Sequence, residues 1–196
     1  MKRYLFQYAA LRKDTDFDFV VPALSVAMGV LLAAAVIPRT PPDTIRGYGD
    51  AALLSGAGAS FLSAYWKCSR YHIIAALLST SFLGTFAIPV VLAYRGFALS
   101  CASAAVMLDY PSGGALFSAL FLGIPAVIAV PSLIWLSGEA MASSRDLFCR
   151  RFAARPRLRG ATGWRNMLFS FAVLIPAAVL EATVLPALAA ILVNSM

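Results

Sequence analysis

Charged side chains are scarce in this sequence, and their scarcity excludes an ordinary soluble domain. Only 13% of the 196 residues are Asp, Glu, Lys or Arg, whereas 61% are hydrophobic. Soluble domains carry about 25% charged residues, because charge must cover a surface that faces water. A chain this apolar can place hydrocarbon side chains on its outer surface when that surface faces lipid. We therefore expect a single all-α, polytopic membrane domain.

Histidine and cysteine are also rare, which excludes several kinds of chemical site. The chain has one histidine, His72, and three cysteines, Cys68, Cys101 and Cys149, which lie far apart in the sequence. A zinc site with the usual spacing and a disulfide framework are therefore not expected. One histidine cannot supply an H-E-x-x-H metalloprotease motif, and the sequence has no G-x-x-x-x-G-K-[ST] phosphate loop. We expect no enzymatic activity, no metal and no cofactor.

Long apolar runs are what the sequence has instead. A helix that crosses a bilayer needs about 20 residues, because it rises 1.5 Å per residue through hydrocarbon about 30 Å thick. Five runs come close to or meet this length, and they lie at residues 19–37, 72–92, 94–110, 115–136 and 167–193. Residues 137–166, between the last two runs, are predicted to form a basic loop.

Two further segments are expected to lie at the membrane surface. Residues 1–18 mix basic, acidic and aromatic side chains, which is typical of a cytoplasmic arm that lies on the membrane. Residues 51–66 place Leu54, Phe61 and Tyr65 on one helical face, while serines interrupt the rest. We favour an amphipathic helix in the outer interface for this segment, with a sixth span as the alternative.

The distribution of positive charge favours one orientation of the helices. Seven arginines cluster between the fourth and fifth spans: Arg145, Arg150, Arg151, Arg155, Arg157, Arg159 and Arg165. Basic segments beside spanning helices stay in the cytoplasm and contact anionic lipid headgroups. Five spans place this cluster on the same side as the basic arm, which predicts a cytoplasmic amino terminus and an exterior carboxyl terminus. The net charge of +7 therefore indicates topology and lipid contact rather than nucleic-acid binding.

Glu181 is the strongest candidate for a functional residue. It is expected near the middle of the fifth span, where an ionised carboxylate costs several kcal/mol unless it is paired, hydrated or protonated. Such a residue serves a substrate or ion pathway, or it holds the bundle together through hydrogen bonds. The sequence leaves both roles open. Pro186 follows Glu181 in the same span.

The remaining candidates are residues that turn or bend helices. Arg95 and Gly96 are predicted to form a tight reversal between the second and third spans, with Arg95 reaching the headgroups. Pro125 and Pro131 predict a fourth span that is bent or broken at two places.

Three stretches of the sequence together resemble the bacterial stage II sporulation protein M family. They are Tyr94-Arg95-Gly96-Phe97 before a small-residue span, Gly123-Ile124-Pro125 through Val130-Pro131-Ser132-Leu133-Ile134, and Leu180-Glu181-Ala182-Thr183-Val184-Leu185-Pro186. The length, the apolar composition and the order of these pieces are also similar to that family. The resemblance covers the chain from about Phe61 to its end.

This resemblance implies a non-enzymatic membrane scaffold that acts in forespore engulfment. It implies two peptidoglycan-degrading partners, the stage II sporulation proteins D and P, which the scaffold localises at the sporulation septum of the bacterial cell membrane. A homo-oligomer is compatible with this role. The competing interpretation comes from the residues alone, and it is a small-solute or ion transporter subunit in which Glu181 is the buried titratable site.

Overall fold

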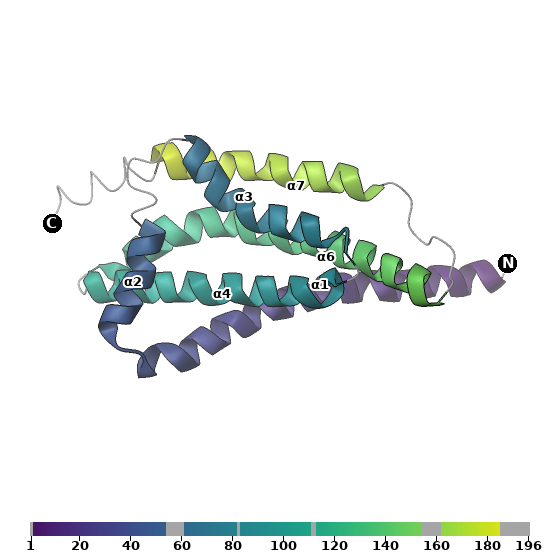
Figure 1. Cartoon of the computed structure of the whole chain (residues 1–196). Coiled ribbons are helices and arrows are strands. Elements are labelled where there is room, and N and C mark those ends of the chain that lie inside the picture. The colour runs from purple at the N-terminus through teal and green to yellow at the C-terminus, as the bar shows by residue number, and fades with distance from the viewer. Residues whose placement is uncertain (1, 54–60, 82, 111–112, 154–161, 185–196) are drawn as a thin grey trace.

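Helices account for the regular structure of the chain in the computed structural model (Figure 1). The structure describes residues 2–53, 61–81, 83–110, 113–153 and 162–184, and no β-strand occurs in these ranges. In chain order the elements are α1 (Lys2–Val36), the 3-10 turn η1 (Ile37–Arg39), α2 (Pro42–Leu53), α3 (Phe61–Leu78), α4 (Gly84–Asp109), α5 (Gly114–Ser118), the π-helical turn η2 (Ala119–Gly123), α6 (Ile124–Ala153), α7 (Thr162–Val179) and a second π-helical turn, η3 (Leu180–Val184). The prediction of an all-α fold is confirmed.

Four of the helical segments are long and apolar enough to cross a membrane. They are Phe19–Arg39, Gly84–Asp109, Ile124–Phe148 and Arg165–Thr183. Large apolar side chains point outward from them, including Leu24, Leu31 and Val127, and such a surface suits contact with lipid. These helices are compatible with a membrane protein, whereas the predicted count of five crossing helices stays a prediction.

α3 lies among these segments although its sequence is more polar. It packs against α4, α6 and α7. In Figure 1 it runs from the end of the bundle that holds α2, here called the α2 end, towards the end that holds the turn at residues 79–83, here called the turn end. α1, α4 and α7 run from the turn end to the α2 end, and α3 and α6 run the opposite way.

α1 and α4 approach so closely that their contact has room only for glycine. A Cβ on Gly29 would overlap the carbonyl oxygen of Ala93, and a Cβ on Gly96 would overlap that of Val26. Gly96 therefore serves helix packing. The predicted reversal at residues 94–97 is wrong, because these residues lie inside the continuous helix α4.

The chain reverses instead at residues 79–83, and Ser144 of α6 holds this turn. The Ser144 hydroxyl donates to the carbonyl oxygen of Ser81 at 2.6 Å and accepts from the backbone N–H of Thr85 at 2.9 Å. Ser144 lies about sixty positions from Ser81 and Thr85 in the chain, so no local sequence pattern predicts these bonds. α3 and α4 thus replace the predicted spans at 72–92 and 94–110.

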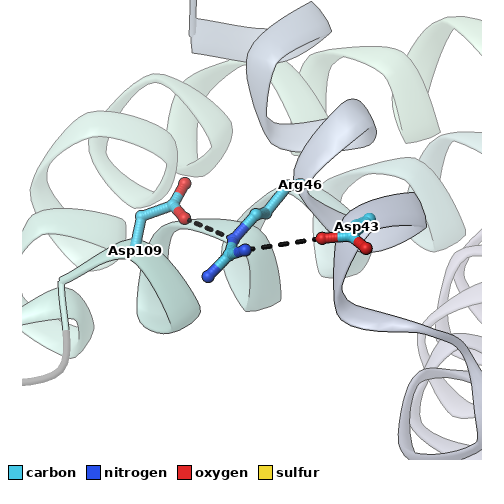
Figure 2. Close-up of polar contacts among 3 residues, drawn as sticks. All are labelled: Asp43, Arg46 and Asp109. Atoms are coloured by element: carbon cyan, nitrogen blue, oxygen red, sulfur yellow. Dashed lines mark hydrogen bonds and ion pairs between the residues drawn. The ribbon is translucent and has the colours of Figure 1, made fainter.

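α2 lies across the α2 end of the bundle and packs against α4 (Figure 1). Its Arg46 contacts two carboxylates, as Figure 2 shows. The Nε atom lies 3.0 Å from Oδ1 of Asp109, the last residue of α4, and Nη1 lies 3.5 Å from Oδ1 of Asp43. The arginine therefore fastens α2 to the end of α4.

The interfacial helix predicted at residues 51–66 does not match the observed elements. Residues 51–53 end α2 and residues 61–66 begin α3, while residues 54–60 lie outside the described part of the chain. The helix that lies across the bundle is α2, which begins at Pro42. Proline suits this position, because the first turn of a helix has no need of its backbone N–H.

The helix predicted at residues 115–136 is interrupted at the first proline and continuous through the second. The π-helical turn η2 separates α5 from α6 just before Pro125. A proline lacks the backbone N–H and crowds the preceding turn, and a wide π turn relieves both constraints. α6 continues through Pro131 to Ala153, so no break occurs there.

The predicted basic loop at residues 137–166 begins as helix. α6 includes residues 137–153, and Ala140 and Met141 pack in an apolar cluster with Ile88 and Leu92 of α4. This packing explains why the helix extends beyond the predicted end of the span: its next turns still bury an apolar face.

Candidate functional site

α3 brings polar side chains into the interior of the bundle. The consecutive turns at its centre carry Lys67, Cys68, Arg70, Tyr71 and His72. Positions three and four residues apart share one helical face, so Cys68, Tyr71 and His72 all point inward and are buried. Apolar residues of α6 and α7 pack around them. The resulting polar cluster lies between α3, α4, α6 and α7.

The first part of the cluster joins α3 to the π-helical turn η3. Lys67 Nζ lies 3.7 Å from Oε1 of Glu181, and the thiol of Cys68 donates to Oε2 of the same carboxylate at 3.4 Å. The Lys67 and Glu181 side chains are only 20% and 18% exposed. Each carboxylate oxygen of Glu181 thus has a partner on α3, which compensates for removing its charge from water.

The second part of the cluster is an aromatic ring shared by two arginines. The guanidinium carbon of Arg95 lies 4.7 Å from the centre of the Tyr71 ring, and that of Arg70 lies 4.9 Å from it. Arg70 Nη2 also donates to the Tyr71 hydroxyl, at 3.4 Å. Cations attract the negative face of an aromatic ring, and the attraction is stronger away from water. Tyr71 therefore holds two positive groups from different helices.

The third part of the cluster is a buried histidine. Nε2 of His72 lies 2.9 Å from the Ser132 hydroxyl, which itself donates to the carbonyl oxygen of Ala129 at 3.0 Å. The tautomer of the ring decides which of these two groups donates, because a neutral imidazole carries its proton on one nitrogen only. Nδ1 is buried and has no hydrogen-bond partner among the described residues.

The contact between α1 and α4 sets the depth of the arginine pair. Gly29 lies ten residues from each end of the Phe19–Arg39 segment, and it contacts Ala93 and Phe97 of α4. Arg95, which lies between these two residues, is therefore level with the middle of that segment. At 1.5 Å per residue, each end of the segment is about 15 Å away along the helix axis. Arg95 and its partner Tyr71 are therefore level with the middle of a segment that is long and apolar enough to cross a membrane.

The structure brings two of the predicted site residues together around α3. Glu181 reaches it from η3, and Arg95 reaches it from α4. Gly96 lies on the opposite contact of α4, against α1. Pro125 and Pro131 lie in the first turns of α6, and neither proline side chain has a polar atom that could join the polar cluster. Pro186 lies outside the described residues.

The predicted arginine cluster lies at the turn end where it is described. Arg145, Arg150 and Arg151 are in the last turns of α6, and Arg165 is in the first turn of α7. Both of these helix ends lie at the turn end in Figure 1, where α1 also begins. Arg155, Arg157 and Arg159 lie outside the described residues.

Sequence reasoning missed the role of Lys67, Arg70, Tyr71 and His72, because it ended a predicted interfacial helix at residue 66 and began the next span at residue 72. Charged and aromatic residues at the edge of an apolar run are typical of such an interface. A signal was nevertheless available, because Ala64, Cys68, Tyr71 and Ala75 follow a helical spacing that continues across the predicted boundary into the next run. The polar residues thus belong to the middle of one helix rather than to the end of another.

The chemistry of the cluster is that of charge pairing and hydrogen bonding within a low-dielectric interior. Its groups can hold helices together, and its arginines can receive an anion. Comparisons with known protein families, with curated proteins and with solved structures find no match to this chain.

Proposed function

We propose that this protein is a non-enzymatic membrane scaffold that binds partner proteins through the surfaces of its helices. The contact between Lys67 and Glu181 carries the proposal. Lys67 neutralises the Glu181 carboxylate, whereas a coupled carrier needs a carboxylate that is available to its substrate or ion. The outward faces of α1 and α4 expose large apolar side chains along their length. Helices of partner proteins can pack on such faces inside the bilayer.

The proposal includes five crossing helices with the turn end in the cytoplasm, and α3 is the second of them. Alternating chain directions of α1, α3, α4, α6 and α7 support this count. The positive-inside rule supports the orientation, because the basic ends of α6 and α7 lie at the turn end. α3 is 18 residues long, or about 27 Å, which is sufficient for a crossing helix buried among others.

Labelling of single cysteines tests the orientation. In a variant with all three native cysteines replaced by alanine, Thr40→Cys at the α2 end should react with a membrane-impermeant maleimide added to intact cells. Arg145→Cys at the turn end should react only after the membrane is permeabilised. The opposite pattern would reverse the orientation, and labelling of both sites in intact cells would contradict an odd number of crossings.

The resemblance to the stage II sporulation protein M family supports a more specific role. On this proposal the scaffold localises peptidoglycan-degrading partners, the stage II sporulation proteins D and P, at the septum during engulfment. A photo-crosslinking amino acid at Phe61, which is exposed at the start of α3, should capture a wall hydrolase in sporulating cells. The same amino acid at the buried Leu133 is the matched control and should capture none. Equal recovery from both positions, or from neither, contradicts this role.

A transporter subunit is the second candidate, and one observation favours it. Glu181 lies in a π-helical turn, and such turns occur frequently at functional sites. Glu181→Gln separates the two functions. A scaffold with this substitution should keep its crosslink from Phe61, because the charge lies away from the binding surface. A proton- or cation-coupled carrier should lose solute flux in proteoliposomes while its helical content is unchanged.

A further inference from the structure

Positive charge exceeds negative charge around the middle of α3. The polar cluster contains three cations, Lys67, Arg70 and Arg95, and one acidic side chain, Glu181. Lys67 already pairs with that carboxylate. Arg70 and Arg95 form no ion pair with any acidic side chain in the part of the chain that the structure describes.

The remaining acidic residues of the chain lie at other levels of the bundle. Asp43 and Asp109 pair with Arg46 at the α2 end. Asp14, Asp16 and Asp18 precede Gly29 by eleven residues or more, or at least about 16 Å of helix, so they lie towards the turn end, and Asp50 is in α2 at the α2 end. Glu139 and Asp146 follow the His72 partner Ser132 along α6, also towards the turn end, and both have contacts of their own.

Two arginines without an acid are unusual at this depth. Intramembrane arginines almost always pair with an acid, with backbone carbonyls or with water in a cavity. The Tyr71 ring offsets part of the cost but carries no net charge. Arginine also presents a planar fork of donors that matches the two oxygens of a carboxylate, and its long stem lets each group turn towards an anion beside the ring. An anion from another molecule would supply the negative charge that these two arginines lack.

Arg70 also lies in the centre of an apolar stripe on the outer face of α3. Exposed side chains follow one another every three or four residues along this face: Leu62, Trp66, Arg70, Ile74 and Leu77. All of them except Arg70 are large and apolar. Such a pattern suits one of two packed transmembrane helices, because apolar side chains extend over several turns and one charge lies in the middle. The matching half is an apolar helix with one central acidic residue.

We infer that the Arg70–Tyr71–Arg95 group is a docking site for a transmembrane helix of a partner protein that carries a central Asp or Glu. The carboxylate of that helix binds the two guanidinium groups, and its apolar residues pack on the α3 stripe. A lipid phosphate fits less well, because headgroups lie at the ends of the span, about 15 Å from Arg95, and snorkelling covers only part of that distance. This inference rests on the proposed scaffold function and names the chemistry of its partner.

Synthetic transmembrane peptides test the inference directly. The full chain is reconstituted in phosphatidylcholine vesicles, and energy transfer to a labelled leucine-rich peptide of about 21 residues measures binding. One peptide has a single central Glu, and its control has Gln at the same position. The Glu peptide should bind about tenfold more tightly than the Gln peptide at a pH where its carboxylate is ionised. Equal binding of the two peptides would overturn the inference.

Variants of the chain assign the effect to the arginine pair. Arg95→Gln and Arg70→Gln should each reduce the preference for the Glu peptide to about twofold or less. Arg39→Gln removes the same charge at the α2 end and should keep the full preference. Arg95→Lys retains the charge, so a partial preference is expected even if the glutamine variant folds poorly. A preference that persists in both glutamine variants would contradict the assignment.

Two further arms distinguish the alternatives. Addition of phosphatidylglycerol to the vesicles should leave the preference for the Glu peptide unchanged. If the added lipid abolishes that preference, the site takes a lipid phosphate and the inference is overturned. The Phe61 crosslink in cells tests the scaffold function separately. If the chain prefers the Glu peptide but no partner is crosslinked in cells, the scaffold function is rejected and the docking site is retained. If the crosslink is as strong in Arg95→Gln as in the unmodified chain, the docking site is rejected and the scaffold function is retained.

Discussion

The ammonium group of Lys67 and the carboxylate of Glu181 face each other at 3.7 Å between α3 and the π-helical turn η3. Each group is about four-fifths buried. Removing one of them leaves the other as an uncompensated charge, so the two residues act as a unit rather than as separate sites.

Lys67→Gln and Glu181→Gln should each lower the free energy of unfolding by about 1–3 kcal/mol, because each leaves one buried charge without its partner. The double variant should be less destabilised than the sum of the two single variants, since it removes both charges together. Unfolding in detergent micelles, followed by circular dichroism, measures the cycle. Additive effects of the two substitutions would mean that the contact contributes nothing.

Gly96→Ala should separate α1 from α4, because its Cβ would overlap the Val26 carbonyl and a backbone atom cannot move aside alone. Overpacking of this kind costs about 1–3 kcal/mol. Gly47→Ala is the control, since nothing lies within 4 Å of a Cβ at that position in α2. The melting temperature of the purified protein should fall for the first variant and stay level or rise slightly for the second. Similar melting temperatures for both would contradict the close approach of the two helices.

Ser144→Ala should loosen the turn between α3 and α4. It removes the hydrogen bonds of a fully buried hydroxyl to Ser81 and Thr85, at a cost of about 1–2 kcal/mol. Hydrogen exchange at residues 79–86 should become faster as well. Ser100→Ala is a matched control, because that hydroxyl bonds to the Gly96 carbonyl of its own helix. Exchange that is equally fast in both variants would show that Ser144 does not hold the turn.

Arg46→Ala should release α2 from the end of α4 with little loss of global stability. The Arg46 side chain is half exposed, and exposed ion pairs contribute less than about 1 kcal/mol. Faster hydrogen exchange in α2, without a change elsewhere, is the expected result, and added salt should produce a similar effect in the unmodified protein. Arg39→Ala serves for comparison, since Arg39 bonds to the carbonyl of Ala35 one turn earlier in the same stretch of helix. An unchanged exchange rate in α2 would mean that apolar packing alone holds it.

The helical content and the apolar helix surfaces could be predicted because they depend on composition and on the length of apolar runs. The positions of the chain reversals could not. Arg95 and Gly96 look like a turn, because a charged residue beside a glycine usually marks the end of a span. In the structure the arginine has Tyr71 as a partner and the glycine has Val26, so both are accommodated within one helix.

The candidate site was only partly predictable for the same reason. Glu181 was found because a lone carboxylate in an apolar run is conspicuous in any sequence. Its partner Lys67 lies 114 residues earlier in the chain, and no spacing rule connects residues that far apart. The residues of α3 were divided between a predicted interfacial helix and a predicted span. The inward-facing side of this helix was therefore not recognised as one continuous surface.

The amino-acid sequence alone determined that this chain folds as helices with apolar surfaces, because hydrophobicity and helix length are properties of local segments. Only the tertiary structure decided which polar residues meet. Lys67 with Glu181, Tyr71 with Arg70 and Arg95, and Ser144 with Ser81 are set by helices packing side by side. In a low-dielectric interior each polar group must find its partner in space, and that partner can come from any part of the chain.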